Sequence, residues 1–190
     1  SAPGSRPDNL SFDGSALWLT DVVQGAQRIF KLSPAGSVLA SFPVPPPTTP
    51  AYFAAGLAAD STRLFYAETI ANMQMGGSRV LELDPNTGAV LRTVYTTSQH
   101  RITGLSRRKG GGLWVLSSLY VEGQGFTNKL IAVSDQGVEL SIETPLYDSD
   151  ALLSTQSSAV SAYGLAEGSN YLLWLGNGGQ AGLIRRMSRF

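Results

Sequence analysis

The sequence predicts an all-β fold made of four repeats of four short strands, in which the last repeat lacks its outermost strand. Three observations predict it. Short apolar runs recur at a nearly constant spacing, turn residues separate them, and no helix-period pattern of useful length is present. With 43% hydrophobic and 15% charged residues, the 190-residue chain is apolar enough to bury a core, which excludes general disorder.

Two independent markers define the repeat. The leucines at 10, 57, 105 and 165 are 47, 48 and 60 residues apart, and the aromatic residues at 18, 65, 114 and 174 are 47, 49 and 60 apart. The longer last step contains an insertion at 144–160. The units therefore cover approximately 8–43, 52–96, 101–144 and 161–190, and we expect them to form one domain over 1–190.

Each strand of a unit has its own pattern. The first strands of the last three units carry glycine before leucine, at Gly56, Gly104 and Gly164, whereas Asn9 breaks the pattern in the first unit. These glycines are expected either to relieve crowding of the innermost strands in a small ring or simply to begin the strands. The second strands are apolar almost throughout, which is typical of strands buried on both faces, and we expect their aromatic residues to pack in the core. The third and fourth strands alternate and are joined by turns with an early polar residue or proline and a late glycine, such as 84–88. The expected first strands are 9–11, 56–58, 104–106 and 164–166, the second 17–21, 64–68, 113–117 and 173–177, the third 29–34, 80–85, 130–134 and 183–187, and the fourth 38–42, 90–94 and 138–142.

Four-stranded units at this period are the signature of a β-propeller. Through the segment 84–90 and its poorer copies at Ser33 and Ser134, the chain resembles the loose group of YVTN, NHL and quinoprotein-type propeller repeats. That resemblance implies the fold but no substrate. A ring of four blades is the main expectation, and half of an eight-bladed ring, completed by a second chain, is the alternative.

The fourth unit ends before an outer strand, which leaves the edge of its third strand unpaired. The segment 1–7 could cover this edge, or a strand of another copy could, which would produce oligomers or filaments. The residues of this candidate assembly edge are Leu183, Ile184, Arg185, Arg186 and Met187.

Composition excludes several classes of site. The chain has no cysteine and one histidine, which rules out disulfides, thiolate metal sites and cysteine nucleophiles. Basic and acidic residues number 14 each, so there is no basic excess for nucleic acid. No apolar run is long enough for a membrane-spanning helix. No phosphate-binding, dinucleotide-binding or serine-hydrolase motif is present, and we assign no catalytic residue and no cofactor.

The second strands end in oxygen-bearing side chains at equivalent positions. Asp21, Glu68 and Asn177 are candidate ligands for calcium, with Ser117 at the matching place in the third unit. Solvated strand ends are the alternative interpretation. Three aromatic residues, Tyr120, Phe126 and Tyr147, are candidate glycan-binding residues in loops.

The sequence therefore favours a non-enzymatic interaction or structural module. Its expected partners are itself, another protein or a glycan. The low charge and a start without methionine favour a secreted or cell-envelope location, in a bacterium. The alternatives are a metal-assisted hydrolase of the lactonase type and a glycan-binding propeller.

Overall fold

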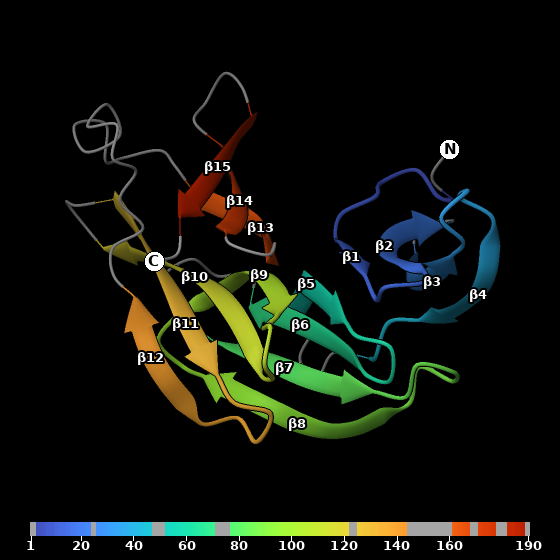
Figure 1. Cartoon of the computed structure of the whole chain (residues 1–190), viewed down its shortest axis with the longest axis horizontal. Helices are drawn as coiled ribbons and strands as arrows, with labels where there is room; N and C mark the ends of the chain where they lie inside the picture. The colour runs from blue at the N-terminus through green and yellow to red at the C-terminus, as the bar shows by residue number, and fades with distance from the viewer. Residues whose placement is uncertain are drawn as a thin grey trace.

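The fold consists of four antiparallel sheets of consecutive strands in a computed structural model (Figure 1). The structure describes residues 3–23, 26–46, 52–70, 77–121, 125–143, 161–167, 171–177 and 182–188, and its side chains over 3–21, 23, 26–46, 54–69, 77–117 and 129–140. The strands are β1 (Leu10–Phe12), β2 (Leu17–Val23), β3 (Ala26–Leu32), β4 (Val38–Pro43), β5 (Tyr52–Ala59), β6 (Leu64–Ile70), β7 (Ser78–Leu83), β8 (Val90–Thr97), β9 (Arg101–Arg107), β10 (Leu113–Val121), β11 (Gly125–Val133), β12 (Glu139–Glu143), β13 (Ser161–Glu167), β14 (Tyr171–Asn177) and β15 (Gly182–Ser188).

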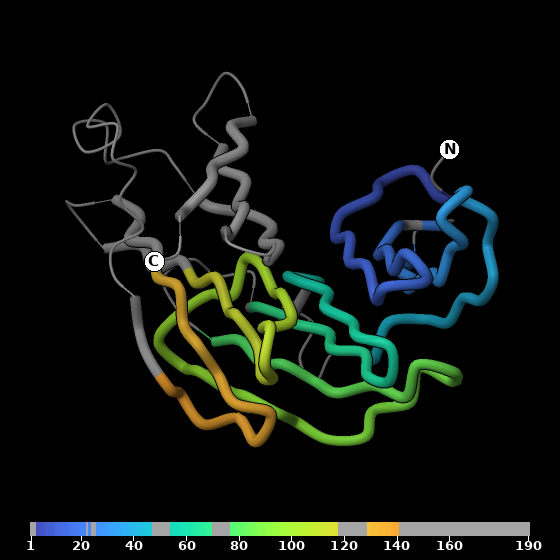
Figure 2. Tube along the Cα trace, viewed as in Figure 1, coloured from blue at the N-terminus to red at the C-terminus, as the bar shows by residue number. Residues whose placement is uncertain are grey.

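The strand order confirms the predicted repeat. Three sheets have four strands in chain order, and the fourth sheet contains only β13, β14 and β15 among the residues described. The first strands of successive sheets contact one another in the order β1, β5, β9, β13, and we call them the inner strands. Figure 2 follows the chain from the blue first sheet through the green second sheet to the orange end of the third. The sheets are thus propeller-type blades, and we use that word for them below.

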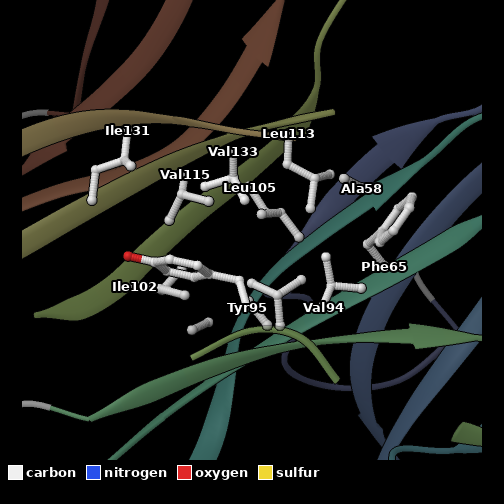
Figure 3. Packing of buried hydrophobic residues seen from close by; sticks show 13 residues of the cluster. Ala58, Phe65, Val94, Tyr95, Ile102, Leu105, Leu113, Val115, Ile131 and Val133 are labelled. Atoms are coloured by element: carbon white, nitrogen blue, oxygen red, sulfur yellow. The ribbon is translucent and has the colours of Figure 1, made fainter. Parts of the chain in front are cut away.

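Apolar side chains fill the space between successive blades. One cluster joins Trp18, Ile29 and Phe42 of the first blade to Leu57 and Tyr66 of the second. A larger cluster lies between the second and third blades (Figure 3) and includes Phe65, Val80, Val94, Tyr95, Ile102, Leu105, Val115 and Ile131. Trp18, Phe65 and Trp114 are each at most 1% exposed, which confirms that these second-strand aromatics are core residues.

The predicted turns between third and fourth strands are present in the first three blades. Gly36, Gly88 and Gly137 all have positive φ, between 74° and 86°. The amide of Gly137 donates to the carbonyl of Ser134 at 3.0 Å. A Cβ on Gly137 would lie 1.8 Å from the carbonyl oxygen of Val94 on β8, so this turn packs directly against the preceding blade. Glycine is required there both by φ and by space.

Close approach of the inner strands explains Gly56. A Cβ at this position would lie 2.8 Å from Cβ and 3.0 Å from the backbone nitrogen of Leu105 on β9. The crowding expected for small residues on inner strands is therefore present at Gly56.

A β-bulge recurs on the inner strands. It inserts Ala55 in β5, Thr103 in β9 and Gly164 in β13. In the first blade the amide of Asp8 and the carbonyl of Asn9 both bond to Thr20, which is the same two-against-one arrangement. Gly164 is itself the bulged residue, so the fourth blade departs by one position from the alignment expected with Gly56 and Gly104.

A charged cluster joins the second and third blades at the end of the strands where the β5–β6 and β11–β12 turns lie. Arg63 and Arg107 each bind both Asp60 and Asp135, and Arg107 Nη1 lies 2.9 Å from Asp135 Oδ1. Both guanidinium groups also lie over the ring of Phe65. Burial opposes ionisation of Asp135, but the hydrogen bonds and charges of the two arginines outweigh it and lower its pKa to about 2.

The segment before β1 does not provide a fourth strand for the last blade. The backbone amides of Gly4 and Arg6 donate to the carboxylate of Asp21, and the amide of Asp8 donates to the carbonyl of Thr20. The segment therefore runs along the end of β2 in the first blade. Closure of the last blade by residues 1–7, which we considered from the sequence, is wrong for the part of this segment that the structure describes.

Candidate functional site

The candidate polar residues lie at the end of the blades where the inner strands β5, β9 and β13 begin; β10 continues beyond Ser117 to Val121. We call this end of the blades the strand-end face. Glu68 pairs with Ala54, Ser117 with Ile102 and Asn177 with Ser161, so the expected equivalence of these positions holds in the strand register. In β5 and β9 the bulge lies directly beside these pairs, whereas in β13 it comes later, between Tyr163 and Leu165. Bulges are common next to functional sites because they redirect side chains.

Asp21 is held by the backbone of the N-terminal segment. Its side chain is buried, at 1% exposure. Its two carboxylate oxygens accept hydrogen bonds from the amides of Gly4, at 2.7 Å, and Arg6, at 2.8 Å. Bonds of this kind to a carboxylate are strong and fix its orientation. The described geometry therefore assigns Asp21 a structural task.

Glu68 forms a buried ion pair. It is 1% exposed, and its carboxylate binds the guanidinium of Arg79 on β7. Burial, followed by the charges of Glu68 and Asp8, raises the pKa of Tyr66. Because Arg79 neutralises Glu68, this carboxylate is not available to a cation without first exchanging partners.

These residues do not fit a metal centre. Within the described part of the chain, no group of three or more histidine, aspartate or glutamate side chains lies close enough to share a metal ion. Asp21 and Glu68 have the protein partners given above, and the side chain of Asn177 lies outside the described residues. We therefore derive no step through a metal.

The third blade has unused hydrogen-bonding atoms at this face. Oγ of Ser117, Oγ1 of Thr103 and Nδ1 of His100 are buried and have no hydrogen-bond partner among the described residues. Ser117 is 1% exposed and Thr103 is 8% exposed. Buried polar atoms are nearly always paired, so three such atoms within one strand end need an explanation. One explanation is that these atoms bind a polar ligand.

His100 is positioned by the second blade. Oγ of Ser78 on β7 donates to the carbonyl of His100 at 3.2 Å, accepts from the amide of Ile102 at 2.8 Å, and lies 2.7 Å from Oγ1 of Thr69. This buried hydroxyl chain fixes the start of β9. Burial, assisted by the charge of Lys129, lowers the pKa of His100 below its usual 6.5. The imidazole is therefore neutral at pH 7 and can accept a proton.

The other candidate residues fall elsewhere. Tyr120 and Phe126 pair with each other in the β10–β11 hairpin, so the expectation that they lie in a loop is wrong. The hairpin continues to Val121 and Gly125 because both strands keep an unbroken register. Tyr147 lies outside the described residues. The five residues of the candidate assembly edge all lie in β15, which pairs with β14, and their role in assembly stays a prediction.

His100 and Thr103 are functional candidates that sequence reasoning missed. The single histidine was visible, but its burial depends on contacts across two blades. Thr103 carries no sequence signal beyond its place before Gly104. Only the bulge makes it the extra residue opposite Leu116 and Ser117 of β10.

Comparisons with known proteins agree with the fold. No protein-family model matches the chain, and no curated protein matches it in sequence. Among solved structures, the chain is similar to a gluconolactonase from Xanthomonas campestris, with a TM-score of 0.55 and 17% sequence identity; the match covers 100% of this chain and 60% of that one. It also matches a periplasmic gluconolactonase from Pseudomonas aeruginosa, with a TM-score of 0.48, 15% identity, and coverage of 95% and 49%.

This similarity shows the fold alone: an all-β, partial propeller at low sequence identity. The chain spans about three fifths of the length of the Xanthomonas protein. The resemblance to propeller repeats expected from the sequence is confirmed at the level of the blades. Among the residues described, no helix has the length and apolar character needed to cross a membrane.

Proposed function

We propose that the protein is a lactonase-like propeller that binds and hydrolyses a small cyclic ester at the strand-end face of its third blade. The observation that carries the proposal is the group of unpartnered buried polar atoms at His100, Thr103 and Ser117. The fold similarity to a gluconolactonase supports the choice of substrate class. Fold alone does not determine function, so the site carries the argument.

The three residues have complementary chemistry. The hydroxyls of Thr103 and Ser117 can donate to the carbonyl oxygen of the ester, where negative charge develops. Neutral His100 can accept a proton from the attacking water and return it to the ring oxygen. Water adds to the carbonyl carbon, the bond from that carbon to the ring oxygen breaks, and one lactone plus one water give one open-chain hydroxy acid.

The test is hydrolysis of glucono-δ-lactone, followed by acid release and corrected for the buffer rate. We expect the His100→Gln variant to lose a factor of about 10² to 10⁴ in kcat, the usual contribution of general acid–base catalysis. Ser117→Ala should raise KM or lower kcat. Ser37→Ala, in the exposed turn between β3 and β4, is the matched control and should leave the rate unchanged. Equal rates for the wild type and the buffer would refute the proposal.

A non-enzymatic interaction module is the second candidate, because the fourth blade ends in the three-stranded sheet of β13, β14 and β15. Among the residues described, β15 pairs only with β14, and an unpaired strand edge presents a row of backbone donors and acceptors to another strand. In this candidate the protein assembles with itself or with another partner through β15. A secreted or cell-envelope location and glycan binding stay predictions under either candidate.

A further inference from the structure

The inner strand of the first blade exposes a residue that the other blades bury. Leu10 pairs with Leu19 as Leu57 pairs with Tyr66 and Leu105 with Val115. Leu57 and Leu105 are each 2% exposed, whereas Leu10 is 61% exposed. The same side chain at the same position of the repeat therefore has two opposite environments.

The difference comes from the neighbouring blade. Leu57 belongs to the cluster that contains Trp18 and Phe42 of the first blade. Leu105 belongs to the cluster that contains Val94 of the second. Each inner-strand leucine is thus covered by the blade that precedes it, whereas the side chain of Leu10 remains open to solvent.

Leu10 lies on one face of the first blade, together with the apolar residues that share that face on β1, β2 and β3. We call it the first face, and it consists of Leu10, Phe12, Leu17, Leu19, Phe30 and Leu32. Leu19, Phe30 and Leu32 form a cluster whose other members, Leu17 and Val23, are also in the first blade. Phe12 is 55% exposed, whereas Ala59, at its position in the second blade, is 4% exposed. Leu19, Phe30 and Leu32 are only 6–7% exposed, so the exposed part of the first face is formed by Leu10 and Phe12. Two large apolar side chains exposed side by side, above a buried apolar cluster, indicate an interaction site.

We propose that a second copy of this chain covers the first face with its fourth blade, and that two copies close an eight-bladed ring. In both interfaces whose side chains the structure describes, the face of a blade that corresponds to the first face packs against the blade before it. β13 contacts β9 and β10, so the third blade already covers one face of the fourth, and its other face is the next in the series. The ring thus continues the interface that the chain already repeats.

Symmetry and charge both permit this assembly. A two-fold axis creates the fourth-to-first contact twice, so no blade is left uncovered. Eight blades lie within the range known for propellers. The formal net charge of zero means that two copies do not repel each other at long range. The proposal does not depend on the proposed lactonase activity.

The test is the mass of the purified chain over a range of concentrations, by analytical ultracentrifugation. We expect a dimer, and we expect Leu10→Asp to weaken it by about a hundredfold or more in dissociation constant. Leu39→Asp is the matched control, because Leu39 on β4 is 59% exposed but lies outside the first face. That variant should leave the dimer intact. Circular dichroism establishes that each variant is folded.

Three results would overturn the proposal. The first is a wild-type monomer at every concentration. The second is a dimer that Leu10→Asp and Leu39→Asp weaken equally, which would indicate that the dimer contact involves the outer strands. The third is a dimer that Ile184→Pro abolishes but Leu10→Asp does not, which would indicate that the copies pair through the edge of β15. A Phe12→Asp variant repeats the test if Leu10→Asp does not fold.

Discussion

Replacing Gly56 by alanine tests the contact between inner strands on which the propeller arrangement depends. The added Cβ would lie 2.8 Å from Cβ of Leu105 and 3.3 Å from the carbonyl carbon of Gly104. Both belong to β9, and the backbone nitrogen of Leu105 is also within reach, at 3.0 Å. A rotamer change cannot relieve a contact with a Cβ or a backbone atom, so one inner strand must shift.

The expected magnitude follows from two opposing effects. Overpacking a filled interior costs about 1–3 kcal/mol. Replacing glycine restricts the unfolded chain, which returns about 0.4–1 kcal/mol. We therefore expect Gly56→Ala to lower the free energy of unfolding by about 1–2 kcal/mol. For a chain of this size, that corresponds to a decrease of roughly 2–8 °C in Tm.

The assay is urea unfolding monitored by tryptophan fluorescence. Gly56→Val should cost more than Gly56→Ala, because the cost rises with the size of the side chain. Gly36→Ala is the comparison without a steric clash: nothing lies within 4 Å of an added Cβ there, so its cost comes from φ +86°, a conformation that Gly56 does not adopt. Neutral or stabilising effects at Gly56 would refute the close approach of β5 and β9.

The other predictions concern the charged groups and one turn. Asp135→Asn should lower the free energy of unfolding by about 1 kcal/mol at neutral pH, a value reduced for partial exposure. Because the pKa of Asp135 is lowered to about 2, the difference from wild type should persist above about pH 4 and shrink as the pH falls toward 2. Urea unfolding midpoints at several pH values will measure it. Arg79→Met should cost roughly 3 kcal/mol by thermal unfolding, because Glu68 is left charged and 1% exposed; a cost below about 1 kcal/mol would contradict the buried ion pair. Gly137→Ala should cost more than Gly36→Ala, by at least about 1 kcal/mol, because only Gly137 packs against Val94.

The blades could be predicted from the sequence because their signals are local. Period-two alternation and the glycine of each turn lie within a few residues of one another, as at Gly36 and Gly88. The buried second-strand aromatics follow from continuous apolar runs. The register of the fourth blade could not be predicted, because the bulge at Gly164 shifts its pairing by one residue without changing the pattern of apolar residues.

The site could be predicted only in part. The equivalent positions of Asp21 and Glu68 follow from the repeat, but their partners do not. Asp21 binds amides 15 and 17 residues away, and Glu68 binds Arg79 across the β6–β7 pair. Metal binding was inferred from residue type alone, which does not reveal that these carboxylates already bind backbone amides or an arginine. The burial of His100 likewise depends on the packing of two blades.

The most direct test of the proposed site is an NMR titration of the His100 imidazole, which the chain's single histidine makes unambiguous. Burial predicts a pKa below 6.5, so the folded protein should lose stability as the pH falls through 6.5 toward that lower value. Glucono-δ-lactone, or its hydrolysis product, should shift the imidazole signals, and Ser117→Ala should weaken that response. A pKa at or above 6.5, with imidazole signals that do not respond to either compound, would contradict the account.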